Sequence, residues 1–213
     1  VFYNNSAWDG NDPAAGAADD NAIAPDKMAL RPGGTARALN YTSYSRGING
    51  IMLDIVDLPG TVDADDFEFR AGNDASDPAS WPLVQVSPTI AVRPGAGVNG
   101  SDRVTITFPD GAIAKRWLRV TVRATGATGL ISPDVHYWGN AIGDTCDSDT
   151  DACVTPQDEV CVRNNPHTLA ENPAGITDVC DFNRDRKVTP TDAILCRDNG
   201  TSVGDGALVL ITP

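Results

Sequence analysis

Two short acidic stretches, 34 residues apart, constrain this chain more than any other feature. Residues 147–158 read DSDTDACVTPQD, and residues 181–192 read DFNRDRKVTPTD. In each stretch, positions 1, 3 and 5 carry an acidic or amide side chain, and position 12 carries a carboxylate, seven residues after position 5. A helix-loop-helix calcium site wraps its ion with side chains at loop positions 1, 3, 5 and 12 and with a backbone carbonyl at position 7. The spacing therefore predicts two calcium loops, with one Ca²⁺ in each.

Both stretches offer an oxygen at every ligand position of such a loop. In the first loop, the predicted ligands are the side chains of Asp147, Asp149, Asp151 and Asp158 and the carbonyl of Cys153. In the second loop, they are the side chains of Asp181, Asn183, Asp185 and Asp192 and the carbonyl of Lys187.

A helix start overlaps the end of each loop. The sequences TPQD and TPTD combine a threonine N-cap, a proline at the first helical position and an acid that reaches back to the cap. Asp158 and Asp192 are therefore expected both to close the metal shell and to cap a helix. Val154 and Val188, at position 8 of each loop, are expected to fix the loops by a short backbone pairing.

These repeats resemble the dockerin module, which has aspartate at position 12 where EF-hands have glutamate. The resemblance covers about residues 143–201 and includes a VTP..D start and an R.N tail in both repeats. It implies an EF-hand-like loop followed by a helix in each repeat. Position 6, usually glycine, is Ala152 in one loop and Arg186 in the other. The helix sequences also differ from the set that recognises cohesins, so the resemblance implies metal binding but not cohesin binding.

The cysteines mark a boundary between two parts of the chain. All five lie between Cys146 and Cys196, and the first 145 residues have none. We therefore predict one domain over residues 1–138 and the dockerin-like domain over residues 139–205. Residues 206–213, GALVLITP, are expected to form a last strand that packs on the first domain or is donated to a neighbouring molecule.

The first domain has the pattern of a β-sandwich, either jelly-roll or immunoglobulin-like. Residues 50–58, 67–73, 103–109 and 115–124 alternate apolar and polar side chains and are separated by turn residues. In the last of these runs, Leu118, Val120 and Val122 should face the core. Trp117 should then point outward, where it could stack on a sugar as in a carbohydrate-binding module.

Residues 9–32 interrupt this strand pattern. They are rich in Ala, Asp, Gly and Pro and are expected to form a long ordered loop. The segment offers a third possible calcium site without a fixed ligand spacing, from Asp9, Asn11, Asp12, Asp19 and Asp20.

Charge and hydropathy limit the partners. The formal net charge is −13, which argues against nucleic acid or an anionic membrane surface as a partner. No run of 18 apolar residues is present, so no membrane insertion is expected. The whole chain also resembles the C-terminal modules of large secreted planctomycete-type proteins, which implies an extracellular or cell-surface location. A signal peptide is absent from the first residues and is expected to have been removed or to lie upstream.

Three functions fit these observations, none of them catalytic. The two histidines have no plausible nucleophile beside them, and neither G-x-S-x-G nor a phosphate-binding glycine loop occurs. The favoured function is a calcium-stabilised extracellular adhesion or docking module that binds a protein partner. The alternatives are polysaccharide recognition by the sandwich and a structural subunit that self-assembles into a filament or array at the cell surface.

An exported protein would oxidise the thiols that lie close enough together. Cys146 and Cys153 flank the first loop and could form a short bridge. Cys180 could pair with Cys196 or with Cys161, which would leave one thiol free.

Overall fold

The computed structural model describes residues 1–213, and β-strands in two sheets dominate its fold. The first sheet has the order β1 (Tyr41–Thr42), β7 (Asp134–Asn140), β6 (Trp117–Val122) and β3 (Phe67–Gly72). The second has the order β2 (Gly50–Ile55), β5 (Asp102–Thr107) and β4 (Thr89–Arg93). All neighbouring strands are antiparallel except β1, which is parallel to β7. The predicted β fold is therefore confirmed at this level.

The two sheets share one hydrophobic core. Its 13 buried residues include Ile51, Val104 and Ile106 from the second sheet and Leu118 and Val120 from the first. Each fully buried aliphatic side chain of this kind stabilises the fold by about 1.5–3 kcal/mol. The four predicted runs contain β2, β3, β5 and β6 except for one residue at the start of β5, because alternation with a period of two identifies strands that bury one face.

The prediction that Trp117 points into solvent is wrong. Its side chain is on the sheet face opposite Leu118, but a second core cluster covers that face and leaves Trp117 0% exposed. Tyr41, Trp81 and Tyr137 belong to the same cluster. The Trp117 indole Nε1 donates a hydrogen bond to the carbonyl of Val209, at 2.7 Å.

The remaining aromatic residues do not form a surface platform for sugars either. Tyr3, Tyr44 and Trp138 are buried, and Trp8 is half-buried. The few aromatic side chains of the sandwich thus fill its interior.

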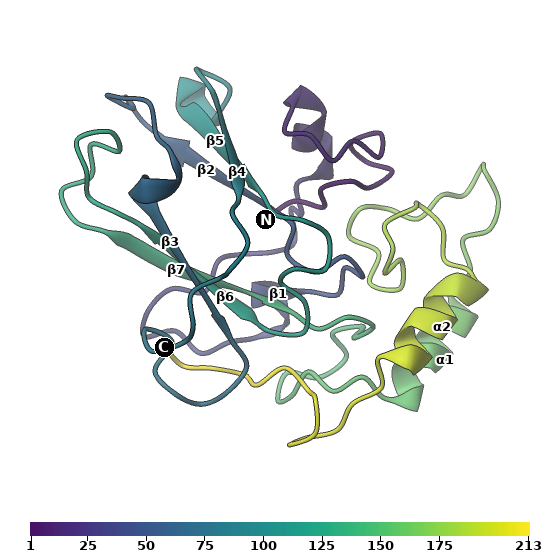
Figure 1. The fold of residues 1–213 in the computed structure, drawn as a ribbon. Helices are drawn as coiled ribbons and strands as arrows, with labels where there is room; N and C mark the ends of the chain where they lie inside the picture. Colours follow the sequence, from purple (N-terminus) through teal and green to yellow (C-terminus); the bar gives the residue numbers. More distant parts are fainter.

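The C-terminal segment, residues 206–213, packs on the sandwich of its own chain. Leu208 and Ile211 are buried in the second core cluster, and Ala36 N–H donates to the Ile211 carbonyl at 2.9 Å. The segment forms no regular strand. It crosses beneath the sandwich from the helical part to the C-terminus, as the yellow trace in Figure 1 shows.

The two α-helices, α1 (Pro156–Asn164) and α2 (Pro190–Asp198), lie side by side at one end of the molecule (Figure 1). They share a small core of eight buried residues that includes Val154, Phe182 and Val188. Both helices have the predicted caps: Thr155 Oγ1 accepts from Gln157 N–H, and Thr189 Oγ1 accepts from Thr191 N–H. None of the helices is long and apolar enough to cross a membrane.

The helical part packs against the sandwich without an intervening linker. Strand β7 ends at Asn140, and residues 141–145, which lead into the first loop, are all buried. Ser45 N–H donates to the Phe182 carbonyl at 2.8 Å, and Ala7 N–H donates to the Arg184 carbonyl at 3.1 Å. The second loop therefore contacts the sandwich and the N-terminal segment directly.

Candidate metal centre

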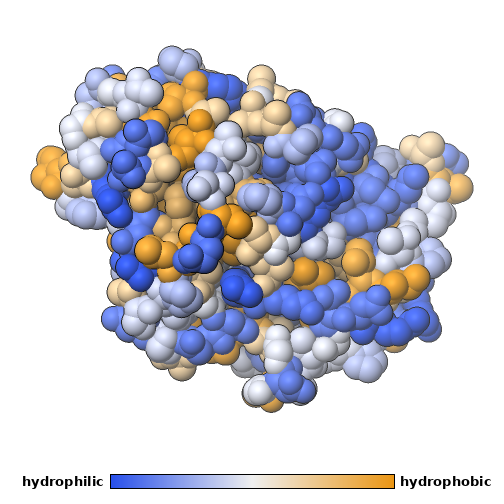
Figure 2. Space-filling view, viewed as in Figure 1, coloured by the Kyte–Doolittle hydropathy of each residue, from blue (hydrophilic) through white to orange (hydrophobic).

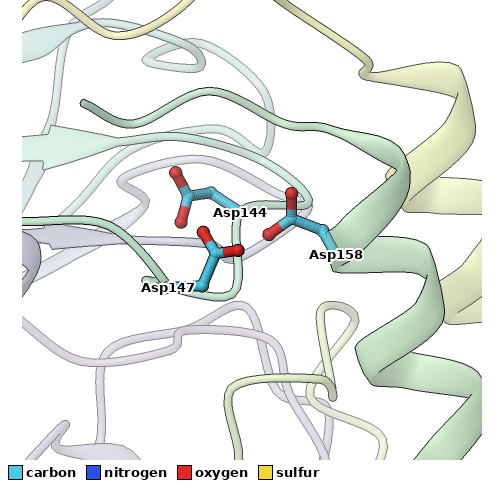
Figure 3. A group of neighbouring side chains, drawn as sticks. All are labelled: Asp144, Asp147 and Asp158. Carbon is cyan, nitrogen blue, oxygen red and sulfur yellow. The ribbon is translucent and has the colours of Figure 1, made fainter.

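Three carboxylates meet at the start of the first loop. Oxygen atoms of Asp144, Asp147 and Asp158 all lie within 4.8 Å of one another. Asp144 and Asp147 come from the segment after β7, and Asp158 comes from the first turn of α1. The three side chains surround one small region, with the carboxylates of Asp147 and Asp158 turned toward each other (Figure 3). No other three acidic, histidine or cysteine side chains come so close, so this group is the clearest place for a metal ion.

Asp158 caps α1 as expected, and its carboxylate also belongs to this acidic group. Its Oδ2 accepts the Thr155 N–H at 2.7 Å, which completes the capping box of α1. Its Oδ1 accepts the backbone N–H and the hydroxyl of Thr145 at 2.8 and 2.7 Å. The carboxylate is fully buried, so these donors fix its orientation toward Asp144 and Asp147.

Asp144 was not among the predicted ligands. It is 1% exposed, and burial, followed by the negative charges of Asp158 and Asp147, raises the pKa of its carboxyl to about 7. Burial and Asp158 also raise the pKa of Asp147. A signal for Asp144 exists in the repeat, because Asp144 and Asp178 both lie three residues before the first ligand of their loop. Each also accepts the backbone N–H of the cysteine two residues later.

The other predicted ligands of the first loop are not part of this group. Asp149 is exposed. Asp151 accepts hydrogen bonds from Ser148 Oγ at 3.0 Å and from the Cys153 N–H at 3.2 Å. Thus the structure joins only Asp147 and Asp158 of the predicted set and adds Asp144.

The acidic and amide side chains of the second loop accept hydrogen bonds from the backbone of the same loop. Asp181, at position 1, is fully buried and accepts the N–H groups of Asp185 and Arg186 at 3.1 and 2.9 Å. Asn183 Oδ1 accepts the same Asp185 N–H at 3.0 Å, and Asp185 Oδ1 accepts the Lys187 N–H at 2.9 Å. The side chains at positions 1, 3 and 5 therefore all turn toward the inside of the loop.

The closing residue of the second loop, Asp192, is also fully buried. It accepts the N–H groups of Phe182 and Thr189 at 3.0 and 2.9 Å. Burial is the main cause that raises the pKa of Asp192. Burial is also the main cause that raises the pKa of Asp181 to about 7; the charges of Asp192 and Asp185 act in the same direction, and Arg184 acts against them. The predicted carboxylates of this loop thus lie close enough to repel one another.

The two loops differ at position 6. Arg186 adopts a left-handed backbone with φ of 68°, the conformation for which this position usually has glycine. Ala152, its counterpart, is outside that region. The second loop has therefore made the sharp turn without glycine, and the first loop has not made it.

The predicted valine pairings occur, and they cross between the repeats. Val188 forms two backbone hydrogen bonds with His167, which follows α1, both at 3.1 Å. Val154 accepts the N–H of Thr201, which follows α2, at 2.8 Å. His167 and Thr201 are 34 residues apart, so each loop is held by the segment after the other repeat's helix.

The acidic residues of the N-terminal segment are not brought together as one set. Asp20 forms ion pairs with Arg93 and Arg103, which neutralise its carboxylate. Asn11 and Asp12 are exposed, whereas Asp9 and Asp19 are buried.

One pair of thiols is in contact. The sulfur atoms of Cys161 in α1 and Cys180 before the second loop are 3.0 Å apart. Cys146 instead lies 3.7 Å from Lys27 Nζ and makes no contact with Cys153, and Cys196 packs in the small core. Of the predicted pairings, only Cys161 with Cys180 is therefore placed to form.

Comparison with protein-family models, curated proteins and solved structures gives no match. The functional interpretation therefore rests on the residues and geometry of the chain itself.

Proposed function

We propose that the chain is a calcium-stabilised extracellular adhesion or docking module without catalytic activity. In this proposal residues 139–205 form a dockerin-like domain that holds two Ca²⁺ ions, and the sandwich is its rigid support. The single observation that carries it is the burial of four carboxylates in two repeats. Asp144, Asp158, Asp181 and Asp192 are at most 1% exposed, and none lies within ion-pair distance of a lysine or arginine.

Buried negative charges of this number require compensation. N–H and O–H groups donate to these carboxylates, but burial still disfavours their ionised form, and like charges nearby add to the effect. A hard divalent cation with oxygen ligands removes both costs at once. Calcium is favoured over zinc because the predicted ligands are all oxygens, from carboxylates, an amide and carbonyls, whereas most zinc sites in proteins include cysteine or histidine.

The docking part of the proposal rests on the exposed faces of the helices. Val160 in α1 and Ile194 in α2 are equivalent positions of the repeat and are 42% and 51% exposed. Figure 2 shows hydrophobic side chains among hydrophilic ones on the side of the molecule that carries the helices. Exposed aliphatic residues at repeated positions are the kind of contact that a protein partner buries.

Calcium titration by calorimetry, with melting curves recorded alongside, tests the metal part. We expect calcium uptake by both loops and a calcium-dependent melting transition. Free Ca²⁺ at about 100 times the dissociation constant should add about 2.7 kcal/mol for each site. A melting profile that is the same with and without a chelator would contradict the proposal.

The docking part needs a second experiment. Binding of the labelled chain to the surface of the cells that produce it should require Ca²⁺ and should weaken in a Val160→Glu, Ile194→Glu double variant. Leu83→Glu, a change of the same kind on the sandwich surface, is the matched control. Binding that survives the double variant but is competed by soluble polysaccharide would favour the carbohydrate alternative. Calcium-dependent filaments of the purified chain in electron micrographs would favour the structural subunit.

A further inference from the structure

The N-terminal segment buries oxygen atoms that have no hydrogen-bond donor. Asn4 Oδ1 and Asp9 Oδ2 are buried without a partner, as is Asn49 Oδ1 directly before β2. Tyr3 Oη and Trp8 Nε1 of the N-terminal segment are also buried without a partner. The residues Asn4, Asp9 and Asn49 are 2%, 4% and 0% exposed. A buried polar group without a partner is costly, and most such groups in folded proteins are satisfied. The amide and carboxylate oxygens can only accept, so these three atoms lack a donor or a cation, whereas Trp8 Nε1 lacks an acceptor.

The orientation of the two amides is fixed by their other ends. Asn4 Nδ2 donates to the Pro13 carbonyl at 3.2 Å. Asn49 Nδ2 donates to the Asn4 carbonyl at 2.8 Å and to Asp110 Oδ1 at 2.7 Å. Exchanging oxygen and nitrogen in either amide would place two acceptors against each other. The unpartnered atoms are therefore oxygens.

Asn4 and Asp9 belong to one closed loop. Asp9 Oδ1 accepts the N–H groups of Ser6 and Asn11 at 2.9 and 3.0 Å, which leaves Oδ2 as the free atom. The Asn4 side chain reaches Pro13 and so spans the same turn from its other end. These contacts order the loop without any ligand.

Asp19 adds a second buried carboxylate near Asp9. It is 1% exposed, and its one hydrogen bond comes from Gly16 N–H at 2.8 Å. Burial raises the pKa of Asp19, and the negative charge of Asp9 raises it further. Neither Asp9 nor Asp19 forms an ion pair, unlike the adjacent Asp20, which binds Arg93 and Arg103.

We infer that the loop of residues 4–19 is a third divalent-cation site, with Asn4 Oδ1, Asp9 Oδ2 and the Asp19 carboxylate as ligands. An amide oxygen together with carboxylates suits Ca²⁺, which accepts mixed oxygen ligands in flexible geometry. This site shares no ligand with the two repeat loops and stands independently of the proposed function. Of the ligands predicted for this segment, only Asp9 and Asp19 are kept. Asp20 is paired with arginines, and Asn11 and Asp12 face solvent.

The position of the site gives it a structural consequence. The same loop contacts the second calcium loop through the hydrogen bond from Ala7 N–H to the Arg184 carbonyl. The guanidinium of Arg186 also lies 4.9 Å from the centre of the Trp8 ring. In Figure 1 this purple segment lies between the sandwich and the loops of the helical part. A cation here would hold rigid the segment that joins the two parts of the molecule.

Calcium content after equilibrium dialysis tests the site. Asp9→Asn keeps the acceptor for Ser6 and Asn11 but loses the charge, and it should lower the bound calcium by one equivalent from the wild-type value. Asp12→Asn, an exposed change in the same loop, should leave the content unchanged. The readout is a difference from wild type, so it does not depend on how many ions the repeat loops hold. Unchanged calcium content in Asp9→Asn would overturn the inference.

A second measurement covers the case in which Asp9→Asn does not fold. In a variant with Asp158→Asn and Asp192→Asn, Tb³⁺ added to the chain should still give luminescence on excitation of tryptophan, because Trp8 adjoins Asp9. Adding Trp8→Phe should remove most of this emission. Absence of sensitised emission before that change, or a crystal grown in calcium with water bonded to Asn4 Oδ1 and Asp9 Oδ2, would overturn the inference.

Discussion

Without metal, the helical part should become less stable as the pH rises from about 4 to 7. Burial raises the pKa of Asp144 and of Asp181 from 3.8 to about 7. Each folded carboxyl therefore holds its proton over a range in which the unfolded chain has released it. Stability is highest below the unfolded pKa and is lost as the pH rises through this window to the folded pKa.

The size of this effect follows from the shifts. One pKa unit corresponds to about 1.4 kcal/mol, so a shift of about three units is worth up to about 4 kcal/mol for each group. Two such groups approach the whole stability of a small domain, about 5–15 kcal/mol. In the proposed calcium-bound form the ion neutralises the ionised carboxylates, so calcium should remove this loss of stability at neutral pH.

Asp144→Asn provides the perturbation, because an amide keeps the shape and cannot ionise. In metal-free buffer, the variant should be more stable than wild type at pH 8 by up to about 4 kcal/mol, and its pH slope should be roughly halved. It should also gain less stability from calcium. Urea unfolding followed by circular dichroism at pH 5 to 8, in buffer stripped of metal by a chelating resin, measures the stability and its pH slope. Repeating it with added calcium measures the gain.

Asp57→Asn is the matched control, since Asp57 is exposed and its left-handed backbone, with φ of 51°, also suits asparagine. The reasoning is refuted if metal-free wild-type stability rises between pH 5 and 8. It is equally refuted if Asp144→Asn leaves the slope unchanged while the control behaves like wild type.

Three further outcomes are expected. Asp192→Ala should lower the free energy of unfolding of the metal-free chain in urea by about 1–3 kcal/mol, because Asp192 accepts two backbone N–H groups inside the core. Asp149→Ala, an exposed change, should alter this free energy by less than about 0.5 kcal/mol. Oxidised glutathione should convert Cys161 and Cys180 to a disulfide with release of reduced glutathione, and peptide mass mapping should detect the linked peptides. The disulfide should raise the free energy of unfolding by about 3 kcal/mol. Two free thiols after equilibration would contradict this. Deleting residues 206–213 should lower the melting temperature of the sandwich, because two buried aliphatic side chains worth about 1.5–3 kcal/mol each are lost; an unchanged melt would contradict it.

Local patterns in the sequence predicted the elements that local physics determines. Alternation identified the strand that carries Leu118 and Val120, because one face of that strand is buried against the other sheet. The caps at Thr155 and Thr189 followed from hydroxyl and carboxylate groups at fixed offsets, and both are present. Strand β4, Thr89–Arg93, was missed, since its side chains are at most half-buried and its alternation is correspondingly weak.

Features that depend on distant segments could not be predicted in this way. Trp117 is on the face that alternation assigned to it, but Val209, 92 residues later, returns to cover that face. Asp144 was missed for another reason. It lies outside the register of a helix-loop-helix calcium loop, and only the folded chain brings it together with Asp158 of α1.

The difference between the two repeats also has a tertiary cause. A left-handed residue other than glycine costs about 1–2 kcal/mol, and Arg186 adopts that conformation where Ala152 does not. The Arg186 guanidinium stacks over the Trp8 ring, and the Arg184 guanidinium stacks over the Tyr3 ring at 4.4 Å. Each contact of this kind contributes about 0.5–2 kcal/mol, which is enough to offset the strained turn. Because both rings belong to the N-terminal segment, the shape of the second loop depends on how firmly that segment is held. A cation bound by Asn4 and Asp9 should therefore strengthen the proposed calcium binding at the second loop more than at the first.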